Sequence, residues 1–320
     1  MNGRERRGRK KMSVRRDGTT FQNTLKTSAA CSGTGLHCGK TVSMTLSPAA
    51  PNTGIVFQRT DMGGTIVPAT WRHVVDTRLC SVVGVDNGAR IGTIEHLMAA
   101  LAGCGVDNAR IEIDGPEVPA MDGSSAPFVE MIEQAGLARQ GVRRRMIEIL
   151  KPVSVADKSA HASLSPSDSF KVSFEIDFNN PAIQRQAATV TLMNGAFKSK
   201  ISRARTFGFE SEVEALRKAG LALGGSLENA IVIGADGILN EDGLRYEDEF
   251  VRHKILDCIG DLYLAGAPIL GHFRGYRSGH ALNLRVLEAL FADSTAWRYT
   301  TAAVRTKATS APVLQLAAGD

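Results

Sequence analysis

Three polar residues recur at helical spacing in the second half of the chain. His253, Asp257 and Asp261 follow one another at intervals of four residues within YEDEFVRHKILDCIGDLYLAG. Because residues four apart lie on the same face of an α-helix, the three side chains belong to one stripe. A histidine and a carboxylate one turn apart can bind one divalent metal ion. The same spacing also fits a surface ion pair, so spacing alone leaves both interpretations open.

A glutamate and a histidine stand side by side in a second helical pattern. The segment IGTIEHLMAALAG, residues 91–103, has apolar residues at helical spacing, with Thr93 as its expected N-cap. Catalytic zinc takes three protein ligands and a water, so His96 can complete the site that the other histidine and carboxylate begin. Neighbouring helical residues point about 100° apart, which lets Glu95 approach that water as a general base. Judged alone, His96 also fits a partly buried histidine near a helix start.

Strand and helix patterns alternate along the chain and must bring these residues together. We expect helices near residues 91–103, 127–136, 211–220 and 247–265, and strands near 109–113, 146–156, 170–178 and 230–233. The basic stretch 137–145 shows no periodic pattern of apolar residues, which predicts a linker there. Both halves contain the same kinds of element in a similar order, which indicates a duplicated α+β fold.

The length of 320 residues favours two domains, because a single hydrophobic core rarely extends so far. The predicted organisation is a disordered basic extension over residues 1–20, a first α+β domain over 21–140, a second α+β domain over 146–300 and a C-terminal tail over 301–320. The active site is expected where the two domains meet.

The net charge of +5 is concentrated at one end of the chain. Residues 1–16 contain eight Lys or Arg and one Glu, so the remaining 304 residues carry a charge of about −2. A nucleic-acid-binding module that uses this end is an alternative function, but the rest of the chain has no stripe of basic and aromatic residues to support it. No signal-peptide h-region, membrane-spanning apolar run or C-x-x-C pair is found. We therefore predict a soluble, cytoplasmic protein that does not bind nucleic acid.

Seven motifs unite these separate signals. In chain order they are TGLHCGK, TRLCSVVG, TIEHLMAALAGCGVDN, PEVPAMDGSSAPF, ISRARTFGF, LNEDGLRYEDEFVRHKILDCIGDLYLAG and YRSGHALN. From about residue 25 to about residue 290 the chain resembles the UDP-3-O-acyl-N-acetylglucosamine deacetylases, the zinc amidohydrolases of bacterial lipid A synthesis. The resemblance implies a two-domain β-α-α-β sandwich with duplicated topology. It also implies an insert at about 206–228 that binds the acyl chain of the substrate.

The resemblance further implies a role for each matching residue. The metal ligands are His96, His253 and Asp257, which hold one Zn²⁺, with Fe²⁺ as the alternative ion. The catalytic residues are the general base Glu95, the second catalytic histidine His280, the carboxylate Asp261 that orients it, the hydroxyl of Thr206 and the basic Lys254. The substrate-binding residues are His37, Phe207, Lys151, Asp177, Phe178 and Arg277.

Two positions depart from the family pattern. Glu210 stands where an apolar residue of the acyl-binding insert is expected, and Arg277 replaces a lysine before SGH. An arginine keeps the positive charge but contacts phosphate as a planar fork in place of a point charge.

The predicted reaction is hydrolysis of the N-acetyl group of UDP-3-O-(3-hydroxyacyl)-N-acetylglucosamine to the free amine and acetate, the committed step of lipid A biosynthesis. Either Glu95 or His280 can protonate the leaving amine, and the sequence does not choose between them. The alternative within this chemistry is a zinc amidohydrolase for another N-acyl sugar. We expect a monomer that contacts the membrane lipid pathway transiently, through its substrate.

Overall fold

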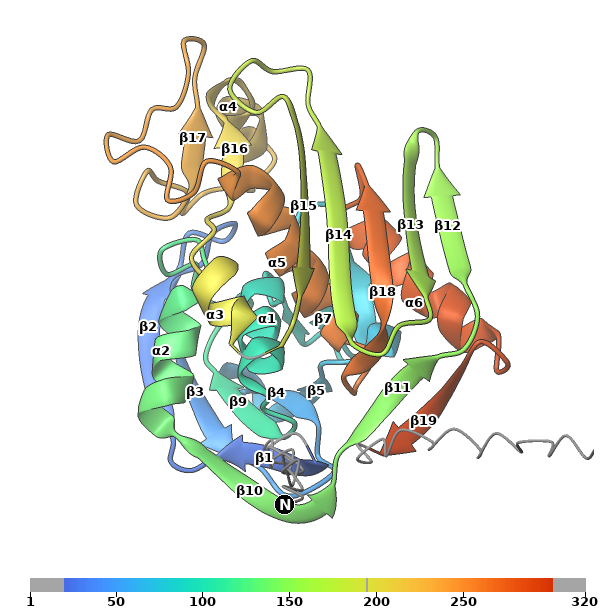
Figure 1. Ribbon diagram of the computed structural model, residues 1–320. Helices are drawn as coiled ribbons and strands as arrows, with labels where there is room; N and C mark the ends of the chain where they lie inside the picture. Colours follow the sequence, from blue (N-terminus) through green and yellow to red (C-terminus); the bar gives the residue numbers. More distant parts are fainter. Residues whose placement is uncertain (1–19, 194, 302–320) are drawn as a thin grey trace, which may run out of the picture.

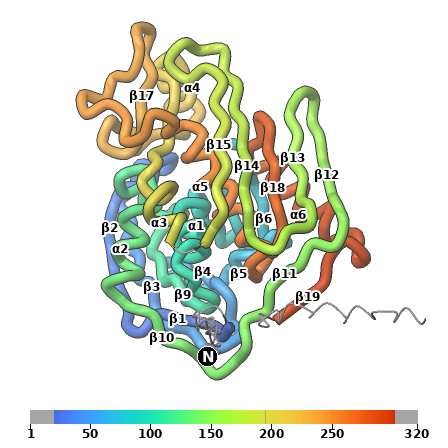
Figure 2. Tube along the Cα trace, in the orientation of Figure 1, coloured from blue at the N-terminus to red at the C-terminus, as the bar shows by residue number. Residues whose placement is uncertain are grey.

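The computed structural model describes residues 20–193 and 195–301, and the described chain forms two similar halves (Figures 1 and 2). The predicted basic extension over 1–20 and the predicted tail over 301–320 lie outside the described residues, apart from Thr20 and Thr301. In Figure 2 the chain completes the blue to green half before it enters the green to red half.

The first half contains a five-stranded sheet. Across the sheet its strands are β2 (Ala29–Thr34), β3 (Thr41–Pro48), β9 (Ala109–Ile113), β4 (Ile55–Arg59) and β5 (Thr65–Pro68). The pair β9 and β4 is parallel, with Ala109 opposite Ile55, and the other neighbours run antiparallel. Strand β9, which comes last along the chain among these five, is therefore the central strand of the sheet.

The sheet of the second half repeats this arrangement. In the equivalent order its strands are β12 (Val153–Asp157), β13 (Ala160–Ser165), β18 (Ile269–Tyr276), β14 (Phe170–Asp177) and β15 (Arg185–Thr191). Again one pair, β18 and β14, is parallel and the others are antiparallel. Strands β11 (Arg145–Ile149) and β19 (Trp297–Thr301) extend the sheet beside β18. Order and direction match strand for strand, which confirms the predicted α+β fold with duplicated topology.

Four helices lie between the two sheets. In the first half α1 (Glu95–Cys104) precedes the central strand and α2 (Ala126–Ala135) follows it; in the second half α5 (Glu249–Tyr263) and α6 (His280–Ala292) hold the same places. Helix α1 packs along α5, α2 contacts β2, and α6 contacts β12 and β13 (Figure 1). The layers therefore follow the order β-α-α-β.

Helices α1 and α5 approach each other at a glycine. A Cβ added to Gly260 would lie 2.0 Å from the backbone oxygen of Glu95, so the contact requires a residue without a side chain. Around this point Leu97, Ile255 and Ile259 are completely buried. The crossing therefore places the first turn of α1 beside the middle of α5.

Each half carries extra elements between an edge strand of its sheet and the helix that precedes its central strand: between β5 and α1 in the first half, and between β15 and α5 in the second. In the first half these are β6 (Val74–Asp76), β7 (Val82–Gly84) and β8 (Arg90–Ile91); in the second half they are α3 (Ala196–Lys200), β16 (Phe207–Phe209), α4 (Glu210–Lys218) and β17 (Ile231–Ile233). The predicted insert at 206–228 falls within the second group, and none of the side chains of α4 is buried. No helix in the described ranges has the length and apolarity that crossing a membrane requires.

The segment predicted as a linker, 137–145, is not irregular. Residues Leu137–Arg143 form strand β10, which pairs antiparallel with β1 (Phe21–Leu25). The side chains of β10 alternate between exposed and half-buried, and the guanidinium of Arg139 lies 3.7 Å from the ring centre of Phe21. The side chain of Arg139 thus covers an apolar residue of the partner strand, which this segment of the sequence alone could not show. The predicted domain boundaries remain a prediction.

The expected ends of the first helix also differ from the structure. Helix α1 begins at Glu95, and Thr93 does not cap it but takes a left-handed backbone with φ of 53°. The C-cap of the helix is Gly105, two residues after the predicted C-cap Gly103. A Cβ on Gly103 would lie 2.1 Å from the ring of Phe197, so this glycine serves packing against α3.

Candidate active site

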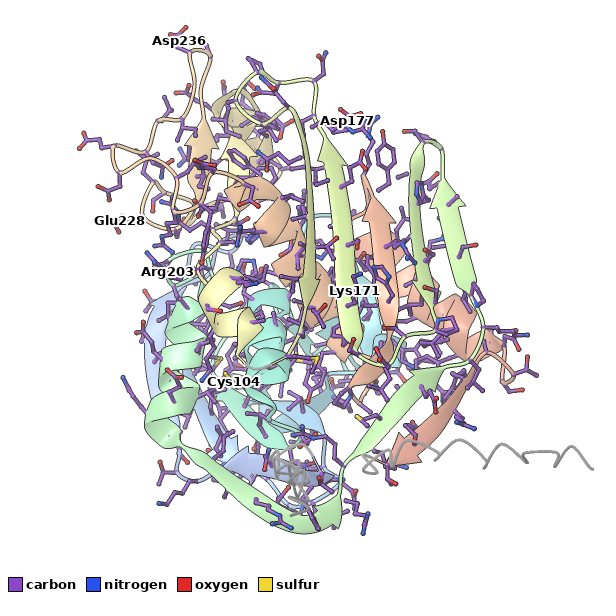
Figure 3. All side chains as sticks on the ribbon, in the orientation of Figure 1. Cys104, Lys171, Asp177, Arg203, Glu228 and Asp236 are labelled. Carbon is purple, nitrogen blue, oxygen red and sulfur yellow. The ribbon has the colours of Figure 1, made fainter. Side chains whose placement is uncertain are left out.

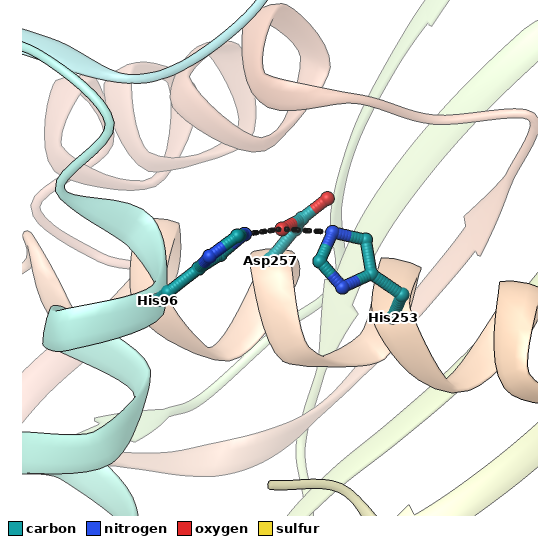
Figure 4. A group of neighbouring side chains, drawn as sticks. All are labelled: His96, His253 and Asp257. Carbon is teal, nitrogen blue, oxygen red and sulfur yellow. Dashed lines mark ion pairs between the residues drawn. The ribbon is translucent and has the colours of Figure 1, made fainter. Parts of the chain in front are cut away.

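Three potential metal ligands converge where α1 crosses α5 (Figure 4). His96 comes from the first turn of α1, and His253 and Asp257 come from successive turns of α5. Asp257 Oδ1 lies 3.5 Å from His96 Nε2 and 3.3 Å from His253 Nε2. All three side chains are buried, and their ligand atoms lie within 4.8 Å of one another. The structure therefore brings together the three residues predicted to bind the metal.

The surroundings of these atoms fit a metal ion. Asp257 Oδ1 is buried yet has no hydrogen-bond partner among the described residues. His253 Nδ1 lies 3.1 Å from the carbonyl oxygen of Ala204, which leaves its Nε2 free to act as a ligand. Two imidazoles and a carboxylate, with a fourth position open, form the donor set of catalytic zinc sites. The cluster can hold one divalent metal ion.

The charges around the cluster favour its metal-binding form. Burial lowers the pKa of His253 to about 3, so this imidazole is neutral, as coordination requires. Burial opposes ionisation of Asp257, but the positive charge of Lys254 helps to hold its pKa well below the usual range. Lys254 Nζ lies 2.6 Å from Asp257 Oδ2, on the side away from the two histidines. One carboxylate oxygen thus faces the cation and the other faces the metal position.

Glu95 lies next to the metal position without joining the ligands. Its side chain is buried in the first turn of α1, and its Oε2 accepts a hydrogen bond of 3.1 Å from the backbone N–H of Ser81. Its Oε1 lies 3.8 Å from His280 Nε2. Burial raises the pKa of Glu95, although His280 and His96 oppose the rise. A carboxylate with a raised pKa is suited to accept a proton near neutral pH.

Asp261 continues the polar stripe of α5 but has different partners. His280 Nδ1 lies 2.8 Å from Asp261 Oδ2, and the amide of Asn283 donates to the same oxygen at 2.8 Å. The hydroxyl of Ser81 donates to Asp261 Oδ1 at 2.6 Å. Burial lowers the pKa of His280, but Asp261 and Glu95 outweigh it and the pKa rises to about 9. The buried imidazole is therefore cationic at neutral pH.

Phe207 begins strand β16, and Thr206 directly precedes it. The backbone N–H of Thr206 donates to Gly123 at 2.8 Å, which ties this turn to the first half. The ring of Phe207 lies 6.3 Å from that of His253 and 5.0 Å from that of Phe250. Both residues are half-buried. The Phe207 ring therefore lies beside His253, and the predicted roles of Thr206 and Phe207 remain predictions.

His37 belongs to the loop between β2 and β3. Its backbone N–H donates to the carboxylate of Glu117, and its Nδ1 accepts from the backbone N–H of Ala222 at 3.4 Å. Burial lowers the pKa of His37. The negative charge of Glu117 opposes this decrease, and the positive charge of His280 lowers the pKa further. The His37 ring thus lies in the electric field of His280.

The four remaining substrate-binding candidates lie in different places. The Phe178 ring is 5.8 Å from that of Phe207. Asp177 ends β14 (Figure 3) and accepts from the hydroxyl of Tyr276 at 3.1 Å. Arg277 is exposed directly after β18, with a left-handed φ of 50°. These three residues lie at one end of the second sheet.

Lys151 is not brought together with the others. It pairs with Asp293 at 2.7 Å, just beyond the C-terminal end of α6, whereas His280 begins that helix. Thirteen helical residues separate the two ends by about 20 Å. Lys151 follows β11, which pairs with the residues at the start of β18. Arg277, in contrast, directly follows the last residue of β18. The structure gives no support to a substrate contact from Lys151.

Two residues that hold the site together were missed in the sequence. Ser81 bonds both Glu95 and Asp261, and Asn283 bonds Asp261. Ser81 lies in TRLCSVVG and Asn283 in YRSGHALN, so the motifs contained both. Serine and asparagine have many structural roles, and their spacing carried no signal that singled them out.

The fold and the site define a metal-dependent hydrolase: two duplicated α+β halves enclose a His-His-Asp cluster beside a glutamate and an aspartate-paired histidine. A comparison with protein families matches residues 22–292 to the family described as UDP-3-O-acyl N-acetylglycosamine deacetylase. The chain therefore belongs to the UDP-3-O-acyl-N-acetylglucosamine deacetylase family, as the motifs indicated.

Individual relatives agree with the family match. The UDP-3-O-acyl-N-acetylglucosamine deacetylase of Acidithiobacillus ferrooxidans is 53% identical over 281 residues, covering 87% of this chain and 92% of that protein. The protein of the same name from Vibrio parahaemolyticus is 50% identical over 283 residues, covering 88% of this chain and 93% of that protein. That of Idiomarina loihiensis is also 50% identical over 283 residues, covering 88% and 92%.

Proposed function

We propose that this protein is a zinc-dependent deacetylase that hydrolyses the N-acetyl group of UDP-3-O-(3-hydroxyacyl)-N-acetylglucosamine. The products are the free amine and acetate, and the reaction is the committed step of lipid A biosynthesis. The observation that carries the proposal is the buried, unpartnered Oδ1 of Asp257 between two histidine Nε2 atoms, with Glu95 beside them. Family membership supplies the substrate class.

His96, His253 and Asp257 would hold the metal. A zinc ion bound there supplies Lewis acidity for the acetyl carbonyl and lowers the pKa of water. Fe²⁺ is an alternative, since two imidazoles and a carboxylate also suit that ion. Lys254 keeps Asp257 ionised and so keeps the site ready to bind a cation.

Glu95 acts as the general base. The backbone N–H of Ser81 fixes one of its oxygens, which leaves the other directed toward His280 and the reaction centre. Its raised pKa increases its affinity for the proton that the attacking water gives up. A positioned base of this kind typically contributes about 10²- to 10⁴-fold to the rate.

His280 supplies positive charge and a proton. Because Asp261 and Glu95 keep it protonated, it can stabilise the oxyanion of the tetrahedral intermediate together with the hydroxyl of Thr206. The same imidazolium can give its proton to the leaving amine, and Glu95 can do so after it has taken the water proton.

The substrate is held from both halves of the molecule. Phe178 and Phe207 form an aromatic pair beside the metal position, and Arg277 provides a cation for the diphosphate. The insert at about 206–228 is proposed to bind the acyl chain, because its residues 222–224 bond to the loop of His37. We further propose that the enzyme acts in the cytoplasm as a monomer and meets the membrane lipid pathway only through its substrate.

The test measures bound zinc and acetate release from the UDP-acyl substrate for the wild type, Glu95→Ala and His253→Ala. We expect stoichiometric zinc and turnover in the wild type, zinc without turnover in Glu95→Ala, and neither in His253→Ala. Glu112→Ala serves as the control, because this glutamate on β9 contacts the hydroxyl of Ser47 and is not one of the residues of the cluster. A wild type that deacetylates another N-acyl sugar but not the UDP-acyl substrate would overturn the proposed specificity. Full activity in Glu95→Ala would overturn the mechanism.

A further inference from the structure

Glu117 is a buried carboxylate that the mechanism above does not use. It lies in the turn between β9 and α2, and only 3% of it is exposed. Its oxygens accept from the backbone N–H of His37 at 2.9 and 3.1 Å, from that of Cys38 at 2.7 Å, and from the hydroxyl of Thr93 at 2.7 Å. All three donors are uncharged.

The three donors belong to two segments that are distant in sequence. His37 and Cys38 lie in the loop between β2 and β3, whereas Thr93 lies two residues before the general base. Isolated backbone bridges reinforce both contacts, joining Gly35 to Pro119 and Gly92 to Glu117. The turn that contains Glu117 is therefore the common support of a substrate-side loop and of the chain that enters α1.

The bond to Thr93 supports an unfavourable backbone. Thr93 has a φ of 53°, a left-handed conformation that is unfavourable for an L residue with a β-branched side chain. This turn sets the direction in which α1 begins, and so the positions of Glu95 and His96. The hydroxyl of Thr93 donates to Glu117 at 2.7 Å, which holds the turn in this conformation.

The loop on the other side of Glu117 supports the proposed acyl-binding insert. The carbonyl oxygens of Leu36 and His37 accept from Gly224 at 3.0 Å and from Leu223 at 3.2 Å. The His37 ring accepts from Ala222 as well. The position of this loop therefore fixes both the His37 ring and residues 222–224.

The approach of the carboxylate to this loop requires a glycine. A Cβ on Gly35 would lie 2.7 Å from Glu117 Oε2 and 2.5 Å from Cys38 Sγ. The φ of Gly35 lies outside the left-handed region, so space for the carboxylate, and not backbone freedom, explains the glycine.

We propose that Glu117 is a positioning residue that holds the His37 loop and the Thr93 turn in a fixed relation to each other. The substrate-side loop and the turn that carries the general base then form one unit. This inference rests on the deacetylase function proposed above. Small displacements of a catalytic group are costly, since about 1 Å can reduce the rate by about 10²-fold.

The first test is Glu117→Gln, which keeps the shape but places an NH₂ group where an oxygen accepted a hydrogen bond. We expect kcat per bound zinc to fall by about 10- to 100-fold. KM rises as well, because the His37 loop faces the substrate, whereas a lower folded fraction would leave KM unchanged. Glu112→Gln on β9 is the matched control, because Glu112 bonds only the hydroxyl of Ser47 and lies outside the site. Its zinc content, kcat and KM stay at wild-type values.

A second variant tests the particular hydrogen bond. Thr93→Val removes the hydroxyl and keeps a β-branched side chain at the strained position. If Glu117→Gln and Thr93→Val both act by removing the hydrogen bond between these two residues, the protein that carries both substitutions loses no more activity than Glu117→Gln alone. Hydrogen exchange gives a readout that does not depend on turnover: the amides of His37 and Cys38 exchange faster in Glu117→Gln and remain protected in Glu112→Gln.

The outcomes separate this inference from the proposed function. A wild type without deacetylase activity, combined with the expected loss of amide protection, would refute the function and support the positioning role. An active wild type whose Glu117→Gln variant keeps its kcat, KM and amide protection would refute the positioning role. If Glu117→Gln fails to fold, Thr93→Val decides alone, and unchanged kinetics in a folded Thr93→Val protein would overturn the inference.

Discussion

Two carboxylates one turn apart on α5 perform different tasks because their neighbours differ. Asp257 faces the metal position with one oxygen and Lys254 with the other. Asp261 accepts hydrogen bonds from His280 and Asn283 and has no part in the metal cluster. At the scale of single residues the partners, and not the residue type, distinguish the carboxylate in the metal cluster from the one that contacts His280.

Asp261→Asn should change the pH dependence of the reaction. The pKa of His280 is raised to about 9 in the folded protein, so its useful protonated form is lost as the pH rises through that value. Without the charge of Asp261 the pKa falls, and we expect the alkaline limb of kcat/KM to move down by about one to three pH units. The same ion pair stabilises the fold fully below the ordinary pKa of histidine and ceases to do so above about pH 9.

The control for this shift is Asp293→Asn, the same change at the exposed partner of Lys151. Its pH profile should coincide with that of the wild type. An alkaline limb at the same pH in Asp261→Asn would mean that a group other than His280 controls it.

At the scale of elements, the site depends on how two helices and one loop meet. Helix α5 supplies two ligands, and the crossing at Gly260 brings the first turn of α1 to them. The N-terminal end of α5 is in turn held by Glu249, which bonds Arg205 in the segment just before Thr206. Each contact joins parts of the chain that are distant in sequence.

Gly260→Ala should separate α1 from α5. The new methyl group would lie 2.0 Å from the backbone oxygen of Glu95, which cannot move without the helix. Overpacking of this kind costs about 1–3 kcal/mol of folding free energy. We expect kcat to fall by about 10²-fold, because the base moves relative to the ligands on α5. Urea unfolding and steady-state kinetics measure both effects.

Gly141→Ala is the control for that variant, because nothing lies within 4 Å of a Cβ added there. It should retain both stability and activity. A Gly260→Ala protein with wild-type kcat would show that the spacing of the two helices does not limit the reaction.

Glu249→Ala should destabilise the fold strongly. Its side chain is completely buried, and that of Arg205 is 7% exposed, so the substitution leaves a buried guanidinium without its partner. Removing one member of a buried pair costs about 3–5 kcal/mol. Glu214→Ala breaks the exposed pair with Lys218 and should change stability by less than about 1 kcal/mol. Similar urea midpoints for the two variants would contradict this prediction.

At the scale of the whole molecule, the metal cluster links the two halves. His96 belongs to the first half, whereas His253 and Asp257 belong to the second. An ion bound by all three stabilises the packing of α1 against α5 in addition to taking part in the reaction. Stability and metal content should therefore change together.

Chelation of the metal should lower the melting temperature of the wild type. An ion present at 100 times its Kd stabilises the folded state by about 2.7 kcal/mol, which corresponds to roughly 4 °C for a chain of this size. Adding zinc back should restore the Tm. In His253→Ala neither chelator nor zinc should change it, and an equal response in both proteins would place the stabilising metal elsewhere.

The sequence alone determined the local features of the site. The four-residue spacing fixed His253, Asp257 and Asp261 on one face of a helix, because the helical period is a property of neighbouring residues. The length and order of the motifs identified the family, and the repeated order of elements predicted the duplicated fold. These features depend on residues close together in the chain or on long ordered patterns.

Tertiary structure decided which distant residues meet. It separated Asp261 from the metal ligands, added Ser81 to the site and moved Lys151 to the far end of α6. It also turned the expected linker into β10, because its partner strand lies more than a hundred residues earlier. Such contacts depend on close packing at positions such as Gly260, where a single methyl group decides whether two helices can touch. No local pattern in the sequence encodes that distance.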